Sequence, residues 1–87
     1  MPYYTYILYT STADKFYIGF TGDELIERLR NHNSNHSGFT GKFIDWQIMH
    51  HEIFEIKKAA MLREKEIKGW KSRNKIIRLI ISSAGSD

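Results

Sequence analysis

A strand-to-helix transition at residues 17–33, YIGFTGDELIERLRNHN, most constrains the fold of this chain. Residues 15–20 favour a strand, and the Thr-Gly-Asp sequence after them favours a tight turn. Thr21, followed three residues later by Glu24, predicts a capping box that satisfies free N–H groups in the first helical turn. We therefore expect a strand, a turn and then a helix that ends near Asn33.

The predicted helix carries polar side chains whose spacing suits a phosphate site. Arg28 and His32 are four residues apart, so they share one helix face with Cβ atoms about 6 Å apart. Arg can hold a phosphate through two hydrogen bonds, while His and the preceding Tyr17 can transfer protons. A separate apolar stripe for the core consists of Leu25, Ile26 and Leu29.

The same residues also have a purely structural explanation. Glu24 and Arg28 could form an ion pair one helical turn apart. Tyr17 could simply pack in the sheet, and His32 could sit near the helix C-terminus, where positive charge is favoured. Because short motifs often match by chance, spacing alone favours this structural explanation over a phosphate site.

Residues 3–9, YYTYILY, predict a first strand that forms a hairpin with residues 15–20. Alternation divides its side chains between two faces: Tyr4, Tyr6 and Leu8 on one, and Tyr3, Thr5, Ile7 and Tyr9 on the other. If the turn is centred on residues 11–12, Tyr6 and Tyr17 lie opposite each other. No Asn-Gly or Asp-Gly pair fixes this register.

Residues 46–54 predict a third strand with a break in alternation near Met49. We expect His50 and His51 to occupy edge or surface positions. Residues 56–70 predict a second helix. Its inner face groups Ala59, Ala60, Ile67 and Trp70.

The end of the chain has a helix break at residues 69–71, after which Ser72 can cap a last helix. Residues 75–82 form a short β-branched run that suits either a strand or a buried helix. The chain of 87 residues suits one domain, which we place at 1–82, with a disordered tail at 83–87.

Residues 34–43 are rich in Ser, Asn and Gly and predict an exposed loop. The loop either follows nucleic acid, with Lys42 on a phosphate and Phe39 near a base or sugar, or is a plain connector. His32 and His36 are four residues apart, but no third ligand is spaced to complete a zinc site with them.

The composition, with no cysteine and no apolar run of about 20 residues, favours a soluble cytoplasmic protein without membrane contact. The net charge of +3 is mildly basic, and most of the positive charge lies in the last third of the chain. The basic residues there are Lys57, Lys58, Arg63, Lys65, Lys68, Lys71, Arg73, Lys75 and Arg78. They could neutralise phosphates or form a solvated helix face.

Tyr4-Thr5-Tyr6, Tyr17-Ile18-Gly19, Arg28, His32-Asn33 and Glu64 form a series that resembles the GIY-YIG nuclease family, especially its small standalone bacterial members. The first triplet is YTY in place of GIY. The resemblance covers residues 3–81. It implies an α+β fold, with a three-stranded antiparallel β-sheet flanked by helices, and also favours a helix at 75–82.

The resemblance also implies a set of catalytic residues, namely Tyr6, Tyr17, Arg28, His32 and Glu64. Glu64 would hold one divalent ion, Mg2+ or Mn2+, whose other ligands are water and phosphate. Helical periodicity does not choose between Glu64 and Glu66; the family's spacing from Ala60 selects Glu64. Contacts to nucleic acid are expected from Gly19, Arg30, Lys42, Lys68, Lys71, Arg73 and Asn74.

The resemblance predicts a metal-dependent DNA endonuclease of the kind used in DNA repair or recombination. A chain this small has little surface for reading sequence, so structure-selective or weakly specific cleavage is expected, or a protein partner that supplies targeting. Two alternatives stay open. One is a nucleic-acid-binding module with weak catalysis, and the other is a protein-interaction domain that uses the aromatic strand at residues 3–9.

Overall fold

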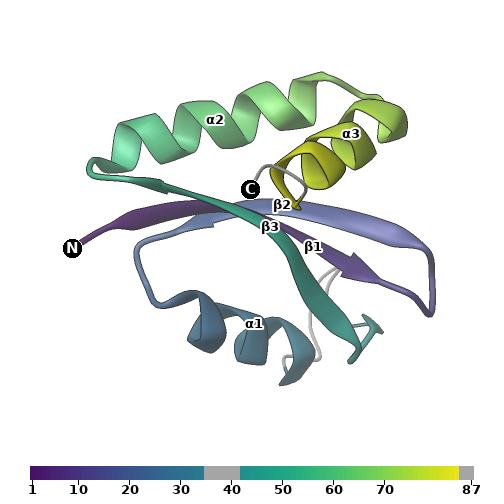
Figure 1. Cartoon of the computed structure of the whole chain (residues 1–87). Coiled ribbons are helices and arrows are strands. Elements are labelled where there is room, and N and C mark those ends of the chain that lie inside the picture. Colours follow the sequence, from purple (N-terminus) through teal and green to yellow (C-terminus); the bar gives the residue numbers. More distant parts are fainter. Residues whose placement is uncertain (35–41, 85–87) are drawn as a thin grey trace.

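A three-stranded antiparallel sheet lies between two helical layers in the computed structural model, which describes residues 1–34 and 42–84. The elements are β1 (Tyr3–Thr10), β2 (Lys15–Thr21), α1 (Leu25–Ser34), β3 (Trp46–Phe54), α2 (Lys57–Gly69) and α3 (Arg73–Ala84). Helix α1 covers one face of the sheet, and α2 and α3 cover the other (Figure 1). The expected α+β fold is confirmed.

The central position of β1 follows from its apolar and aromatic sequence. The strand order is β2-β1-β3, so both neighbours of β1 are antiparallel strands. Its residues from Thr5 to Leu8 are all buried, which requires cover on both faces of the sheet. Alternation then sends successive side chains into two separate cores.

The two cores confirm the predicted division of faces. On the α1 side, Tyr6, Leu8 and Trp46 form a buried cluster that packs against Leu25 and Leu29. On the α2 and α3 side, the buried cluster consists of Ile7, Ile18, Ile67 and Ile76. Ile26 was expected in the α1 stripe, but it is 58% exposed because α1 turns Leu25 and Leu29 toward the sheet instead.

The hairpin register differs from the prediction by two residues. Tyr6 pairs with Gly19, and Leu8 pairs with Tyr17, so the two tyrosines share a face but are diagonal neighbours. The turn is centred further along the chain than expected, because Thr10 pairs with Lys15 and Asp14 adopts a positive φ of 54°.

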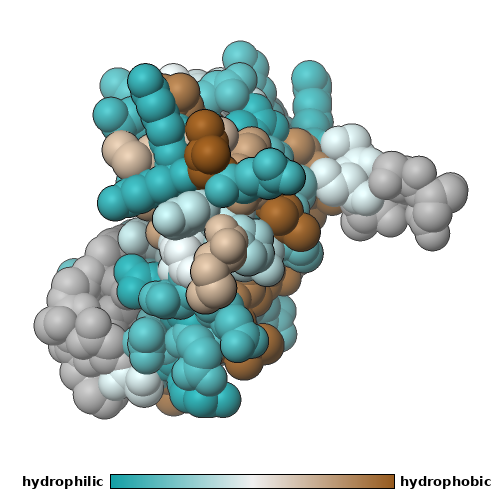
Figure 2. Space-filling model, turned by 90° about the vertical axis from the view of Figure 1, so that its left-hand side faces the viewer, coloured by the Kyte–Doolittle hydropathy of each residue, from teal (hydrophilic) through white to brown (hydrophobic). Residues whose placement is uncertain are grey.

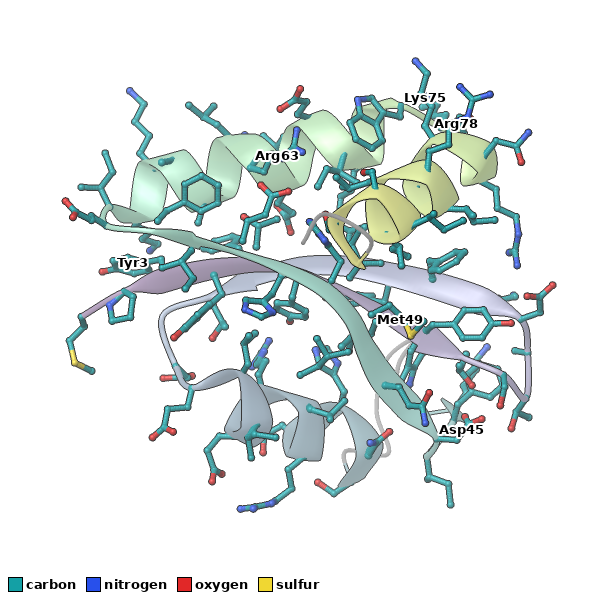
Figure 3. The ribbon with its side chains drawn as sticks, in the orientation of Figure 1. Tyr3, Asp45, Met49, Arg63, Lys75 and Arg78 are labelled. Atoms are coloured by element: carbon teal, nitrogen blue, oxygen red, sulfur yellow. The ribbon has the colours of Figure 1, made fainter. Side chains whose placement is uncertain are left out.

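Asp45 anchors this turn from a distant part of the sequence (Figure 3). Its carboxylate accepts hydrogen bonds from the hydroxyls of Thr10, Ser11 and Thr12, and from the backbone N–H of Thr12. The Thr10 hydroxyl contributes most to lowering the pKa of Asp45 well below its usual range. The turn therefore depends on a residue that the sequence pattern did not single out.

The predicted capping box is not formed. Helix α1 begins at Leu25, too far from Thr21 for that residue to be its N-cap. The Thr21 hydroxyl instead accepts the backbone N–H of Asp23 at 3.0 Å within the turn. At the start of the helix, the backbone N–H of Arg28 donates a hydrogen bond to the carbonyl oxygen of Glu24.

Strand β3 contains the expected irregularity. Its register against β1 shifts between Ile7 and Leu8, leaving Met49 as the extra residue of a bulge. Because β3 is an edge strand, both histidines occupy the expected edge positions, and of the two His51 is exposed while His50 is buried. The bulge turns His50 toward the α2 side of the sheet. There its ring forms a hydrogen bond of 2.8 Å with Glu52, which is also in β3.

The last two helices meet at a sharp break. Lys71 adopts a positive φ of 48° after Gly69 ends α2. The Ser72 hydroxyl then accepts the N–H of Lys75 at 3.3 Å, which confirms the predicted cap. Helix α3 continues to Ala84, and residues 85–87 of the predicted tail lie outside the described residues.

A search of the described helices for one long and apolar enough to cross a membrane found none.

Replacing Ile67 with Ala should lower the free energy of unfolding by about 2–5 kcal/mol, because the Ile67 side chain is completely buried beneath α2. Urea denaturation followed by circular dichroism measures this loss. Leu62→Ala is the control on the same helix, since Leu62 is 56% exposed and its loss should cost under about 0.5 kcal/mol. Equal losses for both variants would contradict the packing described above.

Asp45 should make the fold sensitive to acid. Because the pKa of Asp45 is lower in the folded chain than its ordinary value of 3.8, its stabilising effect is present above about pH 4 and is lost as the pH falls further. The variant Asp45→Asn should therefore be less stable than wild type at pH 7 and show a weaker dependence on pH below 4. Urea denaturation at pH 2.5 to 7 measures this; an unchanged pH dependence would contradict it.

Candidate active site

The hydroxyl of Tyr6 is the centre of a polar cluster on the α1 side of the sheet. It lies 3.0 Å from His32 Nε2 and accepts a hydrogen bond from Arg28 Nε at 3.4 Å. Alternation along β1 directs Tyr6 toward α1, and the four-residue spacing places Arg28 and His32 on the helix face that meets it. The described residues contain no ion pair between Glu24 and Arg28, so Arg28 points to Tyr6 instead.

Tyr17 completes the cluster from β2. Its ring centroid lies 4.9 Å from that of His32 and 6.4 Å from that of Tyr6. Tyr6 and His32 are buried, whereas Tyr17 is only partly buried. The fold thus brings together four of the five predicted catalytic side chains.

Gly19 leaves the space that the Tyr6 hydroxyl occupies. A Cβ atom at this position would lie 2.7 Å from Tyr6 Oη and 3.0 Å from Tyr17 Cε2. Any other residue would therefore push one of the two rings away from its place. The geometry gives this glycine a packing role in the cluster, and its expected contact with nucleic acid stays a prediction.

Burial controls the protonation of the cluster. It raises the pKa of Tyr6 above 10.0, although the hydrogen bond and positive charge of Arg28 act in the opposite direction. Burial also lowers the pKa of His32 below 6.5, and the charge of Arg28 lowers it further. At neutral pH, His32 is therefore uncharged and Tyr6 keeps its proton, while Arg28 stays charged.

Glu64 approaches the cluster from the opposite helical layer. It lies on α2, and its side chain is 15% exposed and forms an ion pair with Lys68 at 3.1 Å. Its negative charge is one of the contributions that raise the pKa of Tyr6, so the two groups are electrostatically coupled. Glu66 is 58% exposed and pairs with Arg63. Of the two carboxylates, Glu64 is the one at the border of the buried face.

The donor set at Glu64 fits a hard divalent cation. Residues 1–34 and 42–84 contain no group of three or more His, Cys, Asp or Glu that could hold a metal ion together. A single carboxylate suits Mg2+ or Mn2+, which keep several water ligands and also bind substrate phosphate. Such an ion would have to compete with the ammonium of Lys68 for the Glu64 oxygens.

The predicted contacts to nucleic acid are spread over the surface. Arg30 is exposed on α1 and pairs with Glu27 at 3.0 Å, and Lys42 is exposed near the end of the predicted loop at residues 34–43. Lys68 is the partner of Glu64, and so it lies beside the predicted metal ligand. His36 and Phe39 lie outside the described residues.

The remaining three predicted contacts lie at the start of α3. Lys71 and Asn74 are exposed. Arg73 pairs with Asp14 in the hairpin turn, and its guanidinium lies 5.0 Å from the centroid of the Phe16 ring. Arg73 therefore ties α3 to the hairpin. A contact of these three residues with nucleic acid stays a prediction.

Two sets of supporting contacts were not predicted from the sequence. Asn33 donates from Nδ2 to the Trp46 carbonyl at 3.2 Å and accepts the Trp46 N–H at 2.8 Å, which fixes the end of α1 to β3. Asn33 directly follows His32, and a polar residue at a helix end was the available signal.

The second set joins β3 to α2 beside Glu64. Arg63 donates to both oxygens of Glu52, at 2.9 and 3.1 Å, and His50 bonds to the same carboxylate. Burial acts to raise the pKa of Glu52, but hydrogen bonds from Arg63 and His50 outweigh it and hold the pKa below its usual value. Because Arg63 immediately precedes Glu64, this network fixes the part of α2 that carries the predicted metal ligand.

Comparison with known proteins agrees with this geometry. A family model described as the GIY-YIG catalytic domain matches residues 2–76. The chain therefore belongs to the GIY-YIG nuclease family, whose domain implies a nucleic-acid substrate.

A similar solved structure is the solution NMR structure of a UPF0213 protein from Bacillus halodurans. It is 28% identical, has a TM-score of 0.61, and the match covers 98% of this chain and 88% of that chain. No match was found among the curated proteins.

The pKa of His32 should respond to Arg28. Titration followed by NMR should place it below 6.5, and Arg28→Met should raise it by removing a nearby positive charge. It should still stay below 6.5, because burial is the larger cause. Arg30→Met is the control, since Arg30 is exposed on the same helix and pairs with Glu27. The predicted coupling would be wrong if both variants left the His32 titration unchanged.

Proposed function

We propose that this chain is a divalent-metal-dependent endonuclease that hydrolyses phosphodiester bonds in DNA. The observation that carries the proposal is the shared hydroxyl of Tyr6, which holds Arg28 and His32 together beside Tyr17. A fixed cation can stabilise charge on a reacting phosphate, and uncharged proton-transfer groups beside it can take up the proton of the attacking water.

Arg28 binds the scissile phosphate and stabilises the negative charge that builds up on its oxygens. Its partial exposure lets it reach a substrate while Nε stays bonded to Tyr6. Tyr17 is the less buried of the two tyrosines, so we assign it the contact with the attacking water. Tyr6 orients His32, which accepts the proton that this water loses.

The reaction forms a bond between the water oxygen and phosphorus and breaks the bond to the leaving oxygen, which takes up a proton. A divalent ion held by Glu64 would polarise the phosphate and stabilise the leaving oxygen. Lys68 pairs with Glu64 in the free chain, and it would contact phosphate when that carboxylate takes another partner.

One contact favours a second candidate function, a binding module with little catalysis. The ion pair between Glu64 and Lys68 already satisfies the carboxylate that the metal would need. Such a module would bind nucleic acid in a salt-dependent way, and Glu64→Gln would leave that binding unchanged.

Several finer predictions go with the proposed nuclease. Structure-selective or weakly specific cleavage, a role in DNA repair or recombination, a protein partner that supplies targeting, and action in the cytoplasm all rest on the small size, the composition and the family.

The proposal is tested by a cleavage assay on single-stranded, duplex, flapped and branched DNA with Mg2+ or Mn2+. Wild type should cut at least one substrate, and Glu64→Gln and Tyr17→Phe should each lower the rate by roughly 100-fold or more. Glu66→Gln is the matched control, because Glu66 is an exposed carboxylate on the same helix. Circular dichroism checks that every variant is folded.

Two results would contradict the proposed nuclease function. Binding without cleavage by wild type would favour the binding module. Equal cleavage by wild type, Glu64→Gln and Tyr17→Phe would remove these residues from the mechanism.

A further inference from the structure

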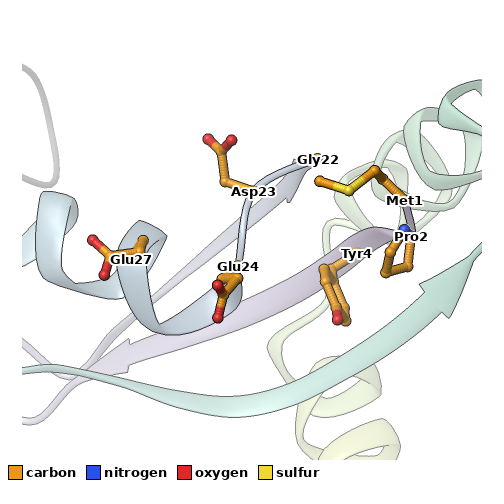
Figure 4. A pocket seen from close by; sticks show the side chains of 7 residues that line it. All are labelled: Met1, Pro2, Tyr4, Gly22, Asp23, Glu24 and Glu27. Carbon is orange, nitrogen blue, oxygen red and sulfur yellow. The ribbon is translucent and has the colours of Figure 1, made fainter.

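A pocket of about 350 Å3 lies at the end of the sheet where the N-terminus enters β1. Its lining consists of Met1, Pro2, Tyr4, Gly22, Asp23, Glu24 and Glu27. Tyr4 lies between Pro2 and Glu24, the residue that precedes α1 (Figure 4). The volume is in the range of small-ligand sites, roughly 300–1,000 Å3. None of the seven lining residues belongs to the catalytic cluster described above.

Strand β1 links the pocket to the catalytic cluster. Tyr4 precedes Tyr6 by two residues in β1, so both side chains leave the same face of the sheet. On β3, His51 is paired with Tyr6, and Ile53 is paired with Tyr4. The rings of Tyr4 and His51 meet edge to face, with centroids 6.1 Å apart.

This end of the sheet face is open. His51 is exposed and Ile53 is 62% exposed, although both lie on the face that α1 covers further along. Viewed from this end, hydrophilic side chains dominate over the two helical layers, and side chains of intermediate and apolar hydropathy lie between them (Figure 2). We define Tyr4, His51 and Ile53 as the aromatic platform.

We propose that the aromatic platform and its pocket bind an unpaired nucleobase of the substrate strand, next to the phosphate held by Arg28. This inference rests on the proposed nuclease function. Aromatic side chains stack on any base, because every base has a π-face. An unpaired base fits the open platform, whereas a base inside a duplex is already stacked and paired.

The charges around the pocket favour a base over a phosphate. Three carboxylates line it; that of Glu27 is paired with Arg30, whereas those of Asp23 and Glu24 repel phosphate oxygens. The same carboxylates accept hydrogen bonds from exocyclic amino groups such as N4 of cytosine. The phosphate of the strand is attracted instead to Arg28, which is also in α1. The two chemical parts of a nucleotide are therefore directed to two neighbouring places.

The spacing fits a nucleotide close to the cleavage point. Two residues of a β-strand span about 7 Å, which separates Tyr4 from Tyr6. Successive nucleotides of one DNA strand are spaced about 3.4 Å apart along the helix axis. The base on Tyr4 therefore belongs to a nucleotide one or two positions from the scissile phosphate. This predicts a preference for single-stranded or flapped substrates over fully paired duplex.

The inference is tested by binding, which does not depend on cleavage. Glu64→Gln protein serves as the background, and its affinities for a fluorescent single strand and for the same sequence as a duplex are measured by anisotropy. Adding Tyr4→Ala should weaken single-strand binding by about 5- to 150-fold, the usual loss for one stacked base, and leave duplex binding unchanged. Tyr4→Phe should retain the affinity, because stacking needs the ring and not the hydroxyl.

Two further variants provide a second test and a control. His51→Ala removes an exposed member of the platform and should weaken single-strand binding in the same direction with little risk to folding. Met49→Ala is the control, because Met49 is an exposed residue of β3 that lines a different pocket with α3 residues. Its single-strand affinity should equal that of the background protein.

The outcomes separate this inference from the proposed nuclease. One outcome is that wild type cuts DNA but Tyr4→Ala and His51→Ala bind single strand and duplex like the background protein. Base binding by the platform is then wrong, and the proposed nuclease function is supported. Another outcome is that wild type cuts no DNA, although single-strand binding depends on Tyr4. Base binding by the platform is then supported, and the proposed nuclease function is wrong. If Tyr4→Ala weakens binding to single-stranded and duplex DNA equally, the platform does not bind an unpaired base. The same conclusion follows if the background protein binds neither DNA.

Discussion

The hydrogen bonds at the Tyr6 hydroxyl are the interaction on which the candidate site depends. One oxygen joins β1 to two side chains of α1, and so it fixes the helix against the sheet at the place where chemistry is proposed. The same burial that makes this contact possible keeps Tyr6 protonated and His32 uncharged near neutral pH. Packing and protonation of the site therefore have one common cause.

The surroundings of this hydroxyl explain several choices in the sequence. Gly19 faces Tyr6 because any side chain there would occupy the space of the phenol ring. Helix α2 supplies Glu64 from the other layer, and the contacts of Arg63 with Glu52 fix that part of the helix to β3. The cluster, the carboxylate and the open platform at Tyr4 all meet around the strand that is buried on both faces.

Local patterns predicted much of this site. Alternation placed Tyr6 and Tyr17 on one face, and the four-residue spacing placed Arg28 and His32 together. Family resemblance selected Glu64, whereas the helical pattern left Glu66 equally open. That ambiguity arose because Leu62 is apolar but exposed, so it does not mark the buried side of α2. Hydrophobic periodicity identifies a buried face only where the apolar residues are in fact buried.

The sequence by itself determined the strands, the first two helices and the face on which each side chain of β1 lies, because these follow from periods of two and 3.6 residues. Only the tertiary structure decided the hairpin register, the burial of His50, and the roles of Asn33 and Asp45. Asp45 holds a turn more than 30 residues away, and Asn33 holds Trp46, which lies 13 residues further along the chain. Such contacts join segments that are distant in the chain, and no local period encodes which of them will meet.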